Sequence, residues 1–141
     1  MLKNFFKKKK KESSNNKNIL VIALLIHAAK IDENYTEAEK KIIIKAIIHL
    51  NKINLSEAEK LLKLSEKKEE ESNQIVEFTR EIKKYKMEFR LKIIEIIWKI
   101  VYSDGTNDNY ESNLIRRICG LLYISDKDSG IIKMKVKNLP K

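Results

Sequence analysis

The sequence predicts an all-α fold of about seven helices, arranged as two related three-helix units. Glycine and proline are scarce, at 3 and 1 in 141 residues, and the isoleucines recur at helical spacing rather than in alternation. A chain of this length suits one domain with a buried core. In addition, one block of sequence from the first half of the chain recurs in the second half. Composition, periodicity and repeat therefore favour the same helical class.

The first helix is expected over residues 15–32 and the second over residues 35–52. Residues 19–29 form an apolar run that could also be the apolar region of a signal peptide. We assign this run to the fold because it has a counterpart in the repeat, and it is too short to span a bilayer. Thr36 and Glu39 stand three residues apart at the start of the second helix, which predicts a capping box.

Five further helices are predicted. Ser56 and Glu59 show the capping spacing again and open the third helix, expected over residues 55–71, and a charged joint near residues 67–73 leads to the fourth. The fourth helix carries apolar residues at helical spacing, namely Ile75, Phe78, Ile82 and Tyr85. The last three are expected at about 87–102, at about 108–123, and as a short helix capped by Ser125.

Polar stripes predict which helices are central. The helix at 87–102 has one narrow polar stripe, formed by Glu88, Lys92, Glu95 and Lys99. Apolar side chains surround the rest of it, as in a helix packed on several sides. The second helix likewise confines its polar residues to Lys41, Lys45, His49 and Lys52. We therefore expect His49 to face solvent.

The repeat relates the two halves of the chain. "LLIHAAKIDENYTEAEKKII" aligns without a gap on "IIWKIVYSDGTNDNYESNLI". The alignment pairs Asp32 with Asp104, Thr36 with Asp108, Glu39 with Glu111, and His27 with Lys99. It places His27 on the solvent stripe. Further along, "INLSEAE" corresponds to "LYISDKD", which makes the second helix about one turn longer than its counterpart.

Residues 19–130 resemble the TerB-like family of tellurite-resistance-associated proteins. The resemblance rests on "LLIHAAKIDENYTEAEK", "INLSEAE", "FTREIKK" and, most specifically, "IIWKIVYSDGTNDNYESNLIRRICGLL" followed by "ISDKD". It implies an all-helical domain of duplicated origin with no known catalysis. It also implies a role for acidic turn residues in binding metal, and an association with stress responses near the membrane.

The first turn departs from the family pattern. Glu33 stands where the family has glycine, and Thr36 stands where it has a second acid. The second turn keeps the family's glycine, Gly105, and its second acid, Asp108. It also has the first aspartate, Asp104, and the glutamate, Glu111. If both turns contribute to one site, the first turn contributes Asp32, Glu39 and Glu33 only.

Two interpretations of the turns stay open. In one, Ca²⁺ or another divalent cation binds carboxylates from both turns, the candidate ligands being Asp32, Glu39, Asp104, Asp108 and Glu111. The spacing is not that of an EF-hand, and a transition-metal site would need His or Cys ligands. In the other, Gly105 ends one helix while Asp108 and Glu111 cap the next. Capping explains Asp32 and Asp104 least well.

The net charge of +10 belongs to the two ends of the chain. Residues 1–17 hold seven lysines against Glu12, and residues 131–141 hold four lysines and no acid, so the middle is neutral. We therefore expect a disordered basic tail over 1–17, a helical domain over 18–130 and a basic extension over 131–141. A folded surface built for nucleic acid would carry basic charge itself.

The N-terminal tail combines aromatic and basic residues, namely Phe5, Phe6, Lys7, Lys8, Lys9, Lys10 and Lys11. It can be a solubilising tail, it can contact an anionic membrane surface, or it can bind nucleic acid phosphates. The single cysteine, Cys119, has apolar neighbours and is expected in the core. We expect a cytoplasmic, non-enzymatic binding or scaffold module with a protein partner, in peripheral contact with the inner membrane face. The alternative is a nucleic-acid-associated protein that acts through its tail.

Overall fold

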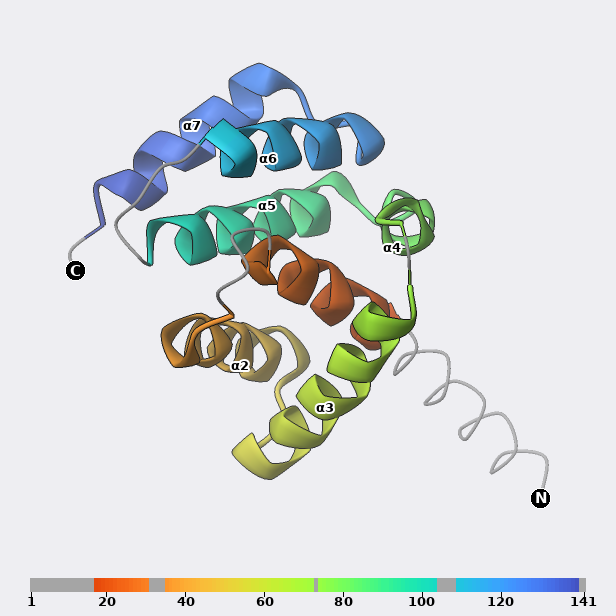
Figure 1. Ribbon diagram of the computed structural model, residues 1–141. Helices are drawn as coiled ribbons and strands as arrows, with labels where there is room; N and C mark the ends of the chain where they lie inside the picture. The colour runs from red at the N-terminus through yellow and green to blue at the C-terminus, as the bar shows by residue number, and fades with distance from the viewer. Residues whose placement is uncertain (1–16, 31–34, 73, 104–108, 140–141) are drawn as a thin grey trace.

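The chain folds into helices throughout the part that can be described. The computed structural model describes residues 17–30, 35–72, 74–103 and 109–139, with residues 109–112 described by their backbone only. Residues 17–29 form the first helix. The remaining helices are α2 (Glu37–Asn51), α3 (Leu55–Glu71), α4 (Val76–Ile82), α5 (Met87–Tyr102), α6 (Asn109–Leu121) and α7 (Asp126–Lys137). No strand occurs in these ranges, which confirms the predicted all-α class (Figure 1).

Helix α5 is the centre of the molecule. It packs against α2, α6 and α7. Figure 1 shows α6 and α7 on one side of α5, with α2 and the first helix on the other. Seven of its residues are buried, namely Ile93, Ile94, Ile96, Ile97, Trp98, Ile100 and Val101. Its predicted polar stripe stays at the surface, so the central position inferred from the stripe is confirmed.

The first helix belongs to the core. Each of residues 21–26 is at most 4% exposed, which is the burial expected of a helix that is apolar on nearly all faces. At its start, the Lys17 Nζ atom lies 5.3 Å from the centroid of the Tyr85 ring. The apolar run at 19–29 is therefore an integral helix of the fold, as the repeat predicted.

Two predicted helix boundaries need correction. The cap of α3 is Asn54 and not Ser56, because the Asn54 side chain accepts a 2.8 Å hydrogen bond from the Glu57 N–H. Asparagine caps as well as serine, so residue type alone could not separate them. Helix α3 ends at Glu71, as predicted, and includes most of the charged joint, because Lys and Glu are good helix formers. Tyr85 lies outside α4, which ends at Ile82.

The C-terminal helix is longer than expected. Helix α7 begins after the Ser125 cap, as predicted, and runs to Lys137. Val136 is only 6% exposed. Helical structure and core packing thus continue beyond residue 130, into the stretch that sequence analysis assigned to a basic extension.

The two halves are repeated in their backbone as well as in their sequence. Helices α2 and α6 begin at Glu37 and Asn109, which the gapless alignment of the repeat pairs with each other. After them, Lys52 and Tyr123 both adopt a left-handed conformation, with φ of 53° and 58°. Each lies two residues before the next cap, Asn54 or Ser125. From the start of α2 or α6 to the next cap, the second half of the chain is therefore one residue shorter than the first half. Helix α2 is two residues longer than α6, and not a full turn longer as predicted.

Candidate functional site

A capping box closes the first turn, at the start of α2. Thr36 donates from its backbone N and its Oγ1 to Glu39 Oε1, at 2.9 and 3.0 Å, and the Glu39 N–H donates to Thr36 Oγ1 at 3.1 Å. The Glu39 side chain is buried, at 4% exposure. The predicted capping role of this pair is confirmed. One oxygen of Glu39 is thereby held in the box, so capping alone accounts for this carboxylate, and its predicted role as a cation ligand stays a prediction.

Tyr35 lies between positive and negative groups next to the capping box. Lys40 Nζ lies 4.8 Å and Lys30 Nζ 5.8 Å from the centroid of its ring, within range of cation–π attraction. Burial, followed by the negative charge of nearby glutamates and Glu66 first among them, raises the pKa of Tyr35 far above its ordinary value. The phenol is therefore neutral at physiological pH and serves as a packed side chain.

His27 lies on the partly exposed face of the first helix, in agreement with the predicted solvent stripe, whereas the other residues from Val21 to Ala29 are buried. Its Nδ1 lies 3.4 Å from Glu69 Oε1, and Lys30 Nζ lies 2.8 Å from Glu69 Oε2. The exposed fractions of the His27 and Glu69 side chains are 34% and 11%. The C-terminal part of α3 supplies the glutamate. The repeat could not show this contact because it aligns His27 with a lysine.

Most of the predicted cation ligands lie outside the described residues. This applies to Asp32, Asp104 and Asp108, and also to Glu33 and Gly105, while Glu111 belongs to α6 with only its backbone described. No group of three or more His, Cys, Asp or Glu side chains in the described ranges is arranged as a metal site. The predicted cation site therefore stays a prediction. The tail residues Phe5, Phe6 and Lys7 to Lys11 also lie outside these ranges.

Cys119 is a core residue, as predicted. It is 1% exposed and forms no disulfide. Burial raises the pKa of its thiol, so it stays protonated at neutral pH. Nearby, the Trp98 indole N–H donates to the Ser129 hydroxyl at 3.2 Å, which satisfies both buried polar groups.

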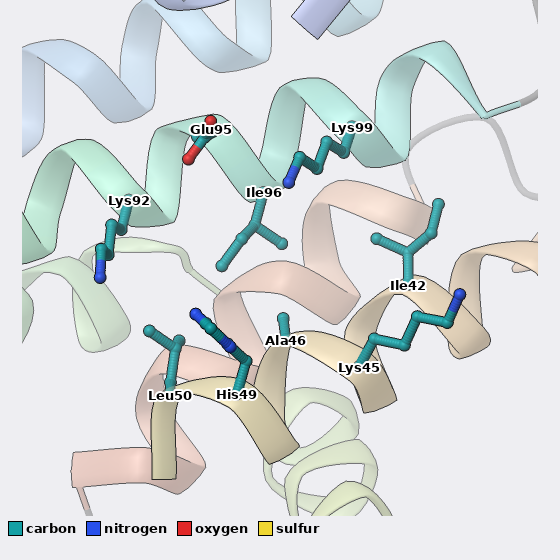
Figure 2. A pocket seen from close by; sticks show the side chains of 9 residues that line it. All are labelled: Ile42, Lys45, Ala46, His49, Leu50, Lys92, Glu95, Ile96 and Lys99. Carbon is teal, nitrogen blue, oxygen red and sulfur yellow. The ribbon is translucent and has the colours of Figure 1, made fainter. Parts of the chain in front are cut away.

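A groove runs between α2 and α5, and sequence analysis did not foresee it. It has a volume of about 410 Å³, and its lining residues are Ile42, Lys45, Ala46, His49, Leu50, Lys92, Glu95, Ile96 and Lys99 (Figure 2). The cationic residues belong to the two predicted polar stripes, which are exposed as expected. The periodicity of each helix identified the stripes, but only the packing of α2 on α5 shows that they border one groove.

The groove carries unbalanced positive charge. Lys45, Lys92 and Lys99 form no ion pair with any carboxylate among the described residues. The single acid of the lining, Glu95, is engaged elsewhere, since its Oε1 lies 3.1 Å from Lys135 Nζ of α7. Between the charges the lining is apolar. The arrangement suits an apolar ligand surface flanked by negative charge.

Comparison with known families decides the identity of the fold. Residues 18–134 match the family model described as tellurite resistance protein TerB. This range covers most of the chain. The chain belongs to the TerB family. The match spans both helix–turn–helix units and reaches into α7, so it includes the acidic turns and both helices of the groove.

The other comparisons add no relative to the TerB assignment. No curated protein matches the chain, and no solved structure does. In the described part of this TerB-family chain, no helix combines the length and the apolar character needed to cross a bilayer.

Proposed function

We propose that this chain is a non-enzymatic binding module of the TerB family, whose two inter-helix turns hold a divalent cation or a basic partner. The repetition of the helix–turn–helix frame carries the proposal. Helices α2 and α6 begin at equivalent positions of the repeat, and the same alignment relates Asp32 to Asp104. Two equivalent carboxylates at equivalent turns are an arrangement that a cation or a basic group can use.

The described side chains support binding rather than catalysis. The Cys119 thiol is buried and protonated, and His27 is engaged with Glu69. The capping box accounts for Glu39, which leaves Asp32 and Asp104 as the first candidates for ligands, joined by Asp108 and Glu111. The family's description also suggests a place in tellurite resistance or a related stress response. A strain that lacks the protein should then be more sensitive to tellurite.

A calcium titration tests the cation site. The wild type should release or absorb heat on binding Ca²⁺, and its melting temperature should rise. Asp104→Asn and Asp32→Asn should reduce both effects, whereas Glu57→Gln, an exposed first-turn acid of α3, should not. Absence of a calcium response in the wild type would exclude Ca²⁺. A lowered melting temperature of Asp104→Asn without any calcium effect would assign this residue to the turn itself.

The basic partner is tested separately. A lysine-rich peptide should bind the wild type and lose affinity to the Asp32→Asn, Asp104→Asn double variant. The same peptide with glutamine in place of lysine is the control. Equal binding of both peptides, or equal binding to both proteins, would rule out recognition of a basic partner by the turns.

The N-terminal tail is proposed to contact the anionic inner face of the membrane through Phe5, Phe6 and the five lysines that follow. Each nearby lysine can contribute about 1 kcal/mol on such a surface. Deletion of residues 1–16 should abolish binding to anionic vesicles, and it preserves Lys17, which belongs to the first helix. Binding that prefers duplex DNA to the vesicles would favour the nucleic-acid alternative, and binding unaffected by the deletion would exclude the tail from both roles.

A further inference from the structure

The groove between α2 and α5 joins cations from both helices in one place. Lys92 and Lys99 lie seven residues apart on α5, a separation of about 10.5 Å along the axis. Lys45 and His49 lie four residues apart on α2 and therefore share a face. Figure 2 shows side chains of both helices lining the space between them. Positive charge thus extends along both sides of the groove.

The surface between these cations is apolar. Ile42, Ala46 and Leu50 come from α2 and are partly buried against the core, and Ile96 comes from α5 and is 8% exposed. The three α2 residues have spacings of four, which places them in one row along the helix. An apolar row with cations on both sides, whose one carboxylate, Glu95, is paired with Lys135 of α7, is complementary to a ligand that is apolar on one face and acidic at its edges.

We propose that this groove binds an amphipathic helix of a partner protein, with apolar residues facing the floor and acidic residues on both flanks. Helices dock in this way by inserting residues spaced i, i+3, i+4 and i+7 into a hydrophobic groove. Acidic flanks then approach Lys45 on one side and Lys92 and Lys99 on the other. The site is separate from the acidic turns, and it takes a partner of the opposite charge.

The distribution of charge favours a helix over an anionic lipid. A fatty acid or phospholipid presents one headgroup and would leave the lysines at the other end of the groove without a partner. A helix with acids two turns apart repeats its charge at intervals of about 10.8 Å along the axis, which matches the separation of about 10.5 Å between Lys92 and Lys99.

A designed peptide provides the probe. It has about 18 residues, enough for a helix to form on binding, with leucine at the i, i+3, i+4 and i+7 positions and glutamate at the flanking positions. A dye at one end reports binding by fluorescence anisotropy. The full-length protein should bind this peptide, with an affinity that falls as salt rises. The same peptide with glutamine in place of glutamate should bind at least about tenfold more weakly.

Charge reversal localises the site. The double variant Lys45→Glu, Lys99→Glu should weaken binding of the acidic peptide about tenfold or more, and it should bind a lysine-flanked version of the peptide better than the wild type does. The double variant Lys63→Glu, Lys127→Glu is the control, since it changes the net charge equally at exposed positions outside the groove. Ala46→Phe, which fills the floor, should weaken both peptides while circular dichroism and melting confirm the fold.

Several outcomes would overturn the proposal. Equal binding to the groove and control variants would place the peptide elsewhere. Groove-dependent binding of oleate or anionic vesicles without peptide binding would make the ligand a lipid. Groove-dependent dimerisation in analytical ultracentrifugation, again without peptide binding, would make the occupant a second copy. The Asp32→Asn, Asp104→Asn variant should retain peptide binding, so failure of the turn site and failure of the groove site are distinguishable.

Discussion

At the scale of single residues, Thr36 has a role that can be measured. Its hydroxyl accepts the Glu39 N–H, and its own N–H donates to the Glu39 carboxylate. Thr36→Ala should lower the free energy of unfolding by about 1 kcal/mol, because it leaves a helix N–H without its partner. Urea denaturation measures the change. Thr36→Ser keeps the hydroxyl and should stay close to the wild type, so an equal loss in both variants would contradict the capping role.

The buried thiol of Cys119 predicts a loss of stability in alkali. Burial raises its pKa in the folded state, whereas in the unfolded chain the thiol titrates near its ordinary value of about 8.5. The contribution of the protonated Cys119 thiol to the free energy of unfolding is therefore complete below about pH 8.5. It is lost as the pH rises towards the pKa of the thiol in the folded protein. Urea denaturation at a series of pH values should show this decline.

Cys119→Ala provides the matched variant for the alkaline decline. It removes the titrating group and should make the fall of stability between about pH 8.5 and pH 10 shallower, and the fall that remains belongs to other groups such as the tyrosines, whose ordinary pKa is about 10. An unchanged slope in Cys119→Ala would show that the thiol does not cause the decline. The thiol should also resist modification in the folded protein and react after denaturation, since the side chain is 1% exposed.

At the scale of helices, the left-handed residues after α2 and α6 mark the repeat. Lys52 has a φ of 53° and carries a side chain where the backbone favours glycine. Lys52→Gly should therefore stabilise the fold by about 0.5–1 kcal/mol. Lys45→Gly is the matched control, because Lys45 lies inside α2 and its replacement should destabilise by about 1 kcal/mol. Destabilisation by both changes in urea would contradict the strain at Lys52.

Local patterns predicted the helices well and their ends less well. The Thr36–Glu39 pair and the limits of α5 were predictable, since capping spacing and a narrow polar stripe are local signals. Asn54 was missed because Ser56, two residues later, shows the same spacing to a glutamate. The end of α3 at Glu71 was predicted, whereas the charged joint overlapped the helix, because charged residues suit an exposed helix as well as a loop.

The candidate site depended on contacts that no local pattern contains. Lys45 and Lys99 were assigned correctly to exposed stripes, yet their meeting across one groove results from the packing of α2 on α5. The contact between His27 and Glu69 was missed for the same reason, since the two residues lie 42 positions apart in the sequence. Asp32 and Asp104 were found through the repeat, and their role rests on the calcium titration.

At the scale of the whole molecule, α7 determines where the fold ends. Trp98 of α5 donates to Ser129, Glu95 pairs with Lys135, and Lys133 Nζ lies 5.1 Å from the centroid of the Trp98 ring. Val136, further along α7, is buried. These contacts join the last helix to the central one along both of their lengths. A chain that ends at residue 130 would lose all of them except the hydrogen bond to Ser129.

Truncation tests the contribution of α7. A chain ending at residue 130 should lose about 3 kcal/mol or more of stability, because Ile132 and Val136 no longer bury apolar surface, each worth about 1.5–3 kcal/mol when fully buried. A chain ending at Asn138 keeps the whole helix and its C-terminal cap, and should melt like the full-length protein. Thermal melting followed by circular dichroism compares the three chains. Equal melting temperatures of the shortest and full-length chains would mean that the second half of α7 is not part of the cooperative fold. Only an unfolded or strongly destabilised short chain agrees with the packing of α7 on α5.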